Sequence, residues 1–232
     1  MKVMTFNTQH CLNYLAQKID YDIMAKTILD LGADVVGLNE MRGAGVSEKY
    51  GAQVAILAEK TNMPYYYFAK AVDFPGGPYG NGILSRIPIV KAETIMIADP
   101  NPHKYEGYYE TRSVLKVELE GGLVVLVSHF GLLPDEQENA VATVVSALKT
   151  EKCILMGDFN MTPDAPLLAP LFEKMKDTAE QFDKPKLSFP SDNPDRKIDY
   201  IFASRDIEIT SADIPPIVAS DHRPHVATVK IG

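Results

Sequence analysis

Hydrophobic positions along the chain repeat with two spacings, one typical of helices and one of strands. Among residues 20–31, Ile23, Met24 and Ile28 fall near one face of a helix. A later, shorter helix is expected because Thr162 can cap it and Pro163 suits its first helical position. Helices are therefore predicted for residues 20–31, 50–62 and 134–149, and near 164–175.

Short apolar or alternating runs between these helices predict a large number of strands. They cover residues 2–8, 33–38, 65–71, 80–86, 88–97, 111–118, 123–128, 152–157, 198–203, 206–212 and 225–230. Gly121-Gly122 reads as a hairpin turn between two of them. Strands with helices between them predict a sheet-based α/β or α+β sandwich, and exclude a helical bundle or an all-β barrel.

One glycine-rich segment, residues 76–82, invites a comparison with phosphate-binding loops. Its spacing matches neither the P-loop nor the dinucleotide fingerprint, and no helix follows it. We therefore interpret it as a turn that leads into a strand at 82–87, and reject a nucleotide-binding role.

The most informative pattern is that polar or acidic residues stand at the ends of apolar strands. Burial of an unpaired carboxylate is costly, so each of these side chains needs a partner or a cation. Strand ends are also where open sheets expose functional groups. The residues concerned are Asn7, Asn39-Glu40, Ser128-His129, Asp158 with Asn160, Asp199 inside a strand, and Asp221-His222.

Each of these residues taken alone also has a purely structural explanation. Glu40 could begin a loop, and Asp199 could satisfy a hydrogen bond in the core. Asp158 could cap a helix, although Thr162 already supplies that cap. Asp158 and Asn160 alternate along an extended segment, so both side chains can face one side. Structural explanations for all six places would require six independent coincidences.

The chemistry of this set suits a hard divalent cation. Mg²⁺ prefers oxygen ligands and is usually held by one or two carboxylates plus substrate phosphate. Glu40 and Asp221, with the amide oxygen of Asn7, form such a sparse set. Two histidines and further carboxylates remain for proton transfer and charge stabilisation. The chain has no GxSxG element, so a serine-hydrolase elbow is excluded.

Composition and charge indicate a globular protein and argue against one built mainly to bind nucleic acid. The 232 residues are 46% hydrophobic and 23% charged, which is ordinary for a globular protein. The formal net charge is −8, and the acidic excess lies in the second half of the chain. A solvated acidic face and a cluster around a cation both explain this excess. A protein built mainly to hold nucleic-acid backbone would usually be basic, although net charge does not exclude a local basic groove.

Cysteine content and apolar run length bear on the cellular setting. Cys11 and Cys153 stand beside apolar runs with no CxxC motif, so we expect buried free thiols and no zinc or disulfide framework. The first residues lack the apolar core of a signal peptide, and no apolar stretch is long enough for a membrane span. We expect a single domain over residues 1–232, a cytoplasmic location and a monomer.

In its motifs and their order, the chain resembles the endonuclease/exonuclease/phosphatase superfamily. The resemblance extends from Asn7 to Val229 and implies a four-layered α/β/β/α sandwich, with two mostly antiparallel sheets flanked by helices. It also implies hydrolysis of a phosphoester that depends on Mg²⁺ or Mn²⁺. The motifs are Thr5-Phe6-Asn7, Leu38-Asn39-Glu40, residues 80–86, Ser128-His129, Gly157-Asp158-Phe159-Asn160, residues 198–202 and Ser220-Asp221-His222.

The resemblance also implies the metal ligands. Glu40 corresponds to the main ligand, with Asn7 and Asp221 in support. Two positions depart from the family pattern. Gln9 stands where some nucleases have an acidic residue, and Asn39 stands where many members have glutamine.

By the same resemblance, the remaining residues act on the phosphate and the attacking water. His222 is implied beside the scissile phosphate, oriented by Asp199, and Asp158 as the residue that positions or deprotonates the water. Asn160 and His129 are implied donors to the phosphoryl oxygens, and Asn81 is an expected substrate contact.

The substrate is expected to be a small-molecule or lipid-derived phosphodiester. The alternatives are a DNA or RNA nuclease of the same fold and a non-catalytic binding module. The chain has no basic run for duplex binding. Arg112 could reach a phosphate or form a surface ion pair. The tyrosines of residues 98–112 could stack on a ligand or pack their loop against the sandwich.

Overall fold

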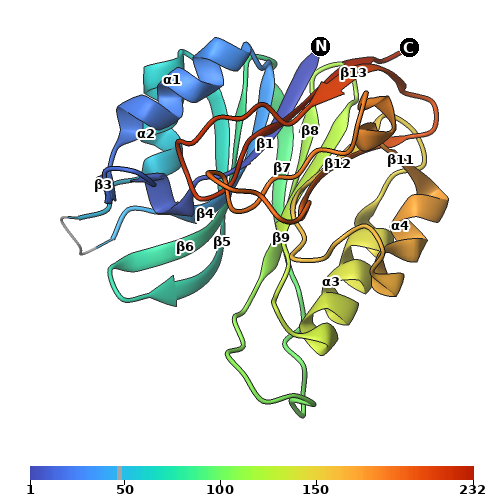
Figure 1. The fold of residues 1–232 in the computed structure, drawn as a ribbon, viewed down its shortest axis with the longest axis horizontal. Coiled ribbons are helices and arrows are strands. Elements are labelled where there is room, and N and C mark those ends of the chain that lie inside the picture. The colour runs from blue at the N-terminus through green and yellow to red at the C-terminus, as the bar shows by residue number, and fades with distance from the viewer. Residues whose placement is uncertain (46–48) are drawn as a thin grey trace.

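The computed structural model, which describes residues 1–45 and 49–232, has two six-stranded sheets packed face to face. Helices cover the outer face of each sheet (Figure 1). The first sheet has the order β13 (Glu208–Asp213), β14 (His225–Lys230), β1 (Lys2–Asn7), β4 (Val35–Arg42), β6 (Gly77–Ser85) and β5 (Tyr65–Phe74). The second has the order β11 (Met175–Asp177), β12 (Asp199–Ser204), β10 (Cys153–Asp158), β9 (Val124–His129), β8 (Ser113–Leu119) and β7 (Ile89–Met96).

Strand pairing within both sheets is antiparallel except at one central pair in each. In the first sheet β1 runs parallel to β4, and in the second β9 runs parallel to β10. The predicted four-layered sandwich with mostly antiparallel sheets is therefore confirmed. A small hairpin of β2 (Leu12–Asn13) and β3 (Lys18–Ile19) stands apart from both sheets.

Three hydrophobic clusters hold the layers together. The central cluster joins the facing sides of the sheets, with Val3 and Ile83 from the first and Val127 and Met156 from the second. The second lies beneath α1 (Tyr21–Leu31) and α2 (Gln53–Thr61). The third lies beneath α3 (Pro134–Ala147) and α4 (Ala169–Lys174). Short 3-10 turns occupy Gln9–Cys11, Pro166–Leu168 and Thr178–Gln181.

Helix α1 illustrates how local sequence sets these elements. The Asp20 side chain accepts hydrogen bonds from the backbone N–H groups of Asp22 and Ile23, which caps the first turn. Gly32 ends the helix in the left-handed conformation, at φ 63°. The helix predicted at 20–31 is thus confirmed almost residue for residue.

Two predicted boundaries are wrong for identifiable reasons. The glycine-rich segment is a strand from Gly77 onward, and a Cβ on Gly80 would lie 2.0 Å from the Ala69 carbonyl oxygen of β5. Glycine there allows close strand approach, not a turn. The helix expected at 164 starts only with the turn at Pro166, because the Thr162 hydroxyl bonds the Asp164 carboxylate instead of capping a helix.

No helix among the described residues is long and apolar enough to cross a membrane. Both cysteines are buried and free, as expected.

Candidate functional site

Strand register brings the polar strand ends of both sheets together. In the first sheet Asn7, the last residue of β1, is level with Asn39 of β4. In the second, Asp158 at the end of β10 is level with His129 on one side and Asp199 on the other. The carboxyl ends of both parallel pairs therefore meet at one edge of the sandwich.

Glu40 reaches this edge because strand β4 is irregular. Glu40 has a left-handed backbone with φ 61°, and the pairing of β4 with β6 shifts register between Leu38 and Met41. Such a bulge is costly for a residue other than glycine, and bulges commonly re-aim a side chain next to a functional site. The prediction that a strand ends at 38 missed it, since β4 continues to Arg42.

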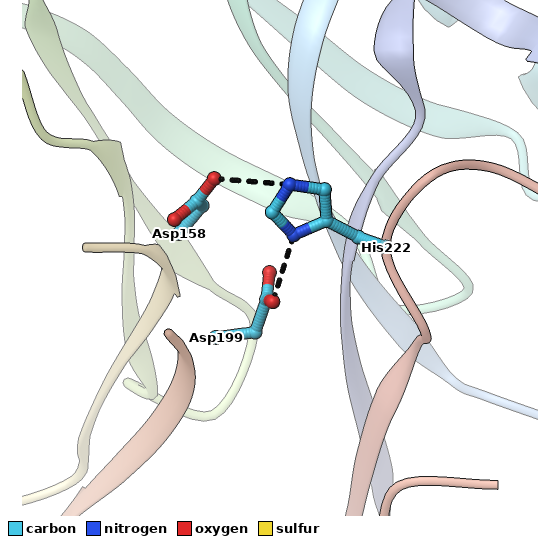
Figure 2. Close-up of side chains that lie close together, drawn as sticks. All are labelled: Asp158, Asp199 and His222. Atoms are coloured by element: carbon cyan, nitrogen blue, oxygen red, sulfur yellow. Dashed lines mark hydrogen bonds and ion pairs between the residues drawn. The ribbon is translucent and has the colours of Figure 1, made fainter. Parts of the chain in front are cut away.

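His222 lies between two buried carboxylates (Figure 2). Its Nδ1 is 2.9 Å from Asp199 Oδ2, and its Nε2 is 3.5 Å from Asp158 Oδ2. Burial would lower the pKa of His222, but the charges of Asp199 and Asp158 raise it to about 10. The imidazole is therefore cationic near neutral pH, and Asp199 fixes its orientation.

Asp158 is the most connected of these carboxylates. Oδ2 accepts a hydrogen bond from Asn7 Nδ2 at 3.0 Å and lies 3.5 Å from His129 Nε2. Oδ1 accepts from the backbone N–H of Asn160 at 3.0 Å. Burial raises the pKa of Asp158 to about 7, with the His222 cation opposing and the Asp199 charge adding to the shift. Such a carboxylate can take up a proton near neutral pH.

Asn160 faces the same site as Asp158, but not by the expected geometry. The segment does not stay extended, because Asn160 adopts a left-handed backbone at φ 51°. A turn closed by the Asp158 carboxylate therefore brings the two side chains to one side. Asn160 Nδ2 donates to the Phe130 carbonyl at 3.0 Å and lies 3.2 Å from His129 Nε2.

Glu40 and Asp221 form the acidic side of the site. Burial raises the pKa of both carboxyl groups, and the charge of Asp221 adds to the shift at Glu40. Asn7 Nδ2 donates to Glu40 Oε1 at 3.1 Å, while Asn7 Oδ1 accepts from the Gln9 backbone N–H. Asn7 therefore stabilises the carboxylates of Glu40 and Asp158 as a donor, while its Oδ1, the atom expected to bind a cation, accepts one hydrogen bond from the backbone.

These side chains surround one cavity of about 480 Å³. The cavity is lined by four carboxylate side chains and by three cationic side chains, one of which is protonated His222. The excess of carboxylate oxygens suits a divalent cation that prefers oxygen ligands. Asp158, Asp199 and His222 also offer three ligand atoms within 4.8 Å of one another, although both His222 nitrogens already face carboxylates. The lining residues are Glu40, Tyr79, Glu110, Arg112, His129, Leu132, Asp158, Asn160, Phe189, Arg196, Ile198, Asp221 and His222.

Asn81 does not line the cavity; it is buried behind the cavity residues and holds Asn39 in place. Asn39 Nδ2 donates to Asn81 Oδ1 at 2.8 Å and to the Ser128 carbonyl, while Asn39 Oδ1 accepts from the Asp158 backbone N–H. Asn81 Nδ2 donates in turn to the Ser113 carbonyl. The expected substrate contact at Asn81 is replaced by this amide bridge, which ties the first sheet to the second.

Sequence reasoning missed Glu110 and Phe189. Glu110 forms a 2.8 Å ion pair with Arg112 at the cavity wall, and Phe189 packs its ring 4.7 Å from that of His222. The one available signal for Glu110 was its place directly before the strand predicted at 111–118, two residues from Arg112. Phe189 lies in an irregular loop, where neither hydrophobic period applies.

Comparisons with known proteins agree on family and fold. The sequence profile described as endonuclease/exonuclease/phosphatase family matches residues 4–222. None of the curated protein sequences matches the chain significantly. An endonuclease/exonuclease/phosphatase from Beutenbergia cavernae is similar over 100% of this chain and 72% of its own, with 25% identity and a TM-score of 0.82.

Two solved structures with more specific names share the fold. The mannosyl-6-phosphatase of Bacteroides thetaiotaomicron is similar over 100% of both chains, with 16% identity and a TM-score of 0.77. The human Nocturnin catalytic domain is similar over 100% of this chain and 94% of its own, with 16% identity and a TM-score of 0.69.

Proposed function

Because the chain belongs to the endonuclease/exonuclease/phosphatase family, we propose that it hydrolyses a phosphoester with the help of Mg²⁺ or Mn²⁺. The observation that carries the proposal is the Asp199–His222–Asp158 chain, buried at one wall of an acidic cavity. A non-catalytic module would have no need to bury a charged histidine between two carboxylates.

The cation belongs on the acidic side of the cavity in this proposal. Glu40 and Asp221 would hold it, with Asn7 positioning Glu40. We assign it there because the nitrogens of His222 already face Asp199 and Asp158. A bound Mg²⁺ or Mn²⁺ would polarise a phosphoryl oxygen and offset charge that develops during the reaction.

The side chains of this protein would divide the remaining work. Asp158 positions a water for in-line attack on phosphorus and accepts its proton, as the bond from phosphorus to the leaving oxygen breaks; that oxygen departs as an alkoxide and takes its proton from solvent. Cationic His222, oriented by Asp199, donates a hydrogen bond to a phosphoryl oxygen. His129 and Asn160 stand where they can donate to the same group.

For the substrate, we propose a small-molecule or lipid-derived phosphodiester over duplex DNA. Duplex binding requires several unpaired lysine or arginine side chains, and both arginines that line the cavity are paired with acids. Arg196 Nε lies 2.7 Å from Asp195 Oδ1, and Arg112 pairs with Glu110. A nuclease remains the alternative activity for the same site.

The test is a panel of substrates offered with Mg²⁺ or Mn²⁺. It contains small diesters, lipid head-group diesters, monoesters including sugar phosphates, plasmid and single-stranded DNA, at low and moderate salt. The Asp158→Asn variant, purified in parallel, controls for contaminating hydrolases. We expect turnover of a small or lipid diester that this variant lacks. Efficient plasmid cleavage with a steep salt dependence would favour the nuclease instead, and no turnover of any substrate would contradict hydrolysis.

A further inference from the structure

Glu110 is a buried acid at the cavity wall that the mechanism above leaves unused. Its side chain is 10% exposed and that of Arg112 is 12% exposed, and Arg112 NH1 lies 2.8 Å from Glu110 Oε1. Among the described residues, this pair and Lys197–Asp177 are the most buried ion pairs that do not involve a histidine. A pair so enclosed is costly to bury, which calls for a reason beyond stability.

The same arginine nitrogen also contacts the catalytic histidine candidate of the second sheet. Arg112 NH1 lies 2.7 Å from His129 Nδ1. A guanidinium can only donate hydrogen bonds, so His129 Nδ1 must be the acceptor. An imidazole that accepts at Nδ1 is neutral and carries its single proton on Nε2.

The other contacts of His129 are compatible with this tautomer. Nε2 lies 3.5 Å from Asp158 Oδ2, a contact with an acceptor that is not a hydrogen bond, so the proton on Nε2 remains available to a substrate oxygen. Asn160 Nδ2, 3.2 Å from Nε2, carries two hydrogens; it donates one to the Phe130 carbonyl, and the second need not point at Nε2. Burial and the Arg112 charge both lower the pKa of His129 well below its usual value, in agreement with a neutral ring.

Glu110 is itself held in place by helix α3. Its backbone N–H donates to Glu136 Oε1 at 2.9 Å, and Glu136 Oε2 accepts from the Leu133 backbone N–H at the start of that helix. Among the described residues, Arg112 Nε and Glu110 Oε1 are both buried without a hydrogen-bond partner, so the contact between Arg112 NH1 and Glu110 Oε1 is an ion pair held by opposite charge. The first turn of α3 is thereby linked, through Glu110 and Arg112, to His129.

We propose that Glu110 is a positioning residue: it holds Arg112 against His129 Nδ1 and so keeps His129 as a neutral Nε2–H donor to the phosphoryl group. This inference rests on the proposed function for its last step only. It also extends the role expected for Arg112, which fixes the tautomer of His129 in addition to lining the cavity.

Nitrogen NMR on the full chain with ¹⁵N-labelled histidine tests the first step without substrate. The His129 signals are identified by their loss in His129→Gln. We expect a protonated Nε2 and an unprotonated Nδ1 near neutral pH. A cationic ring or an Nδ1–H tautomer in the wild-type protein would overturn the proposal, whatever the variants do.

Glu110→Gln tests the residue itself. We expect His129 to lose its single tautomer and kcat to fall about 10- to 100-fold, as for other supporting partners, with a much smaller change in KM. Glu138→Gln, which removes an exposed acid paired with Lys104, is the matched control and changes neither quantity. If Glu110→Gln does not fold, Arg112→Met tests the same contact with His129, and His129 must then also lose its single Nε2–H tautomer.

The outcomes separate the two proposals. A Glu110→Gln protein that keeps the Nε2–H tautomer contradicts the positioning role, even if kcat falls. A tautomer that changes while the wild-type protein hydrolyses no phosphoester contradicts the proposed function and leaves the link from Glu110 to His129 intact.

Discussion

His222 Nδ1 and Asp199 Oδ2 lie 2.9 Å apart, although the two residues belong to different halves of the sandwich. Asp199 begins β12 of the second sheet, and His222 precedes β14 of the first. Their hydrogen bond spans the gap between the sheets, and both side chains are almost fully buried. The orientation of the imidazole therefore depends on correct packing of the two sheets.

Asp199→Asn should reduce kcat about 10²–10⁴-fold while the protein remains folded, because the imidazole loses the charge that keeps it protonated and oriented. Steady-state kinetics with circular dichroism check this. Asp30→Asn, which removes an exposed acid paired with Lys26, is the control and should behave as wild type. Wild-type kcat in folded Asp199→Asn would disprove the assigned role.

Asp158→Asn should reduce kcat by a similar factor, because the water loses the group that positions it and accepts its proton. An asparagine has a single acceptor oxygen, so it can accept from Asn7 or from the Asn160 backbone N–H but not from both, and circular dichroism checks that the variant is folded. Single-turnover kinetics at saturating metal separate this loss from weaker metal binding. Retention of wild-type turnover would assign the proton transfer to another group.

The pH dependence of kcat/KM should be bell-shaped. The pKa of Asp158 is raised to about 7, so activity should rise as pH passes through that value and the carboxyl group loses its proton. The pKa of His222 is raised to about 10, so activity should fall as pH passes through that value and the imidazole becomes neutral. The two limbs are properties of the coupled pair. A flat profile between pH 6 and 8 would contradict Asp158 as the base.

Removal of metal should abolish turnover, and Mg²⁺ or Mn²⁺ should restore it. Glu40→Gln should weaken metal binding at least about tenfold, by analogy with the effect of lost supporting contacts. Isothermal titration with Mn²⁺ measures this directly. Glu208→Gln removes an exposed acid of β13 and serves as the control. Full activity after exhaustive metal removal, verified by elemental analysis, would refute the metal-dependent mechanism.

Gly157→Ala should strongly destabilise the fold. Gly157 has φ 145°, and a Cβ there would lie 1.8 Å from the Ser128 carbonyl oxygen. Gly121 also has a positive φ, but a Cβ there would meet no atom within 4 Å. We expect Gly121→Ala to cost about 1–3 kcal/mol from backbone strain alone, and Gly157→Ala to cost more. Equal free energies of unfolding in urea would show that the close approach to β9 is unimportant.

Much of the site could be predicted because its residues follow apolar strands. Glu40, His129, Asp158 and His222 line one cavity, as expected from their places beside apolar strand segments. The sequence could not reveal the bulge at Glu40, because a left-handed residue inside a strand depends on tertiary packing.

Two other features lay beyond sequence reasoning for a related reason. Glu110 stands in a loop with no hydrophobic period, and its burial follows from contacts with Arg112 and helix α3. Asn81 belongs to one of the family motifs but does not face the cavity, because its amide oxygen accepts a hydrogen bond from Asn39 of the neighbouring strand. In both cases partners distant in sequence decide what the side chain does.

The amide of Asn39 connects β4 of one sheet with β10 of the other, since it accepts from the Asp158 backbone N–H and donates to the Ser128 carbonyl. The reacting groups therefore lie on both sides of the interface between the two sheets, and a shift of one sheet relative to the other would change all the distances between these groups. A ligand that fills the cavity contacts residues of both sheets. Its binding energy therefore contributes to the cohesion of the whole sandwich, and thermal unfolding should shift as a single transition when the site is occupied.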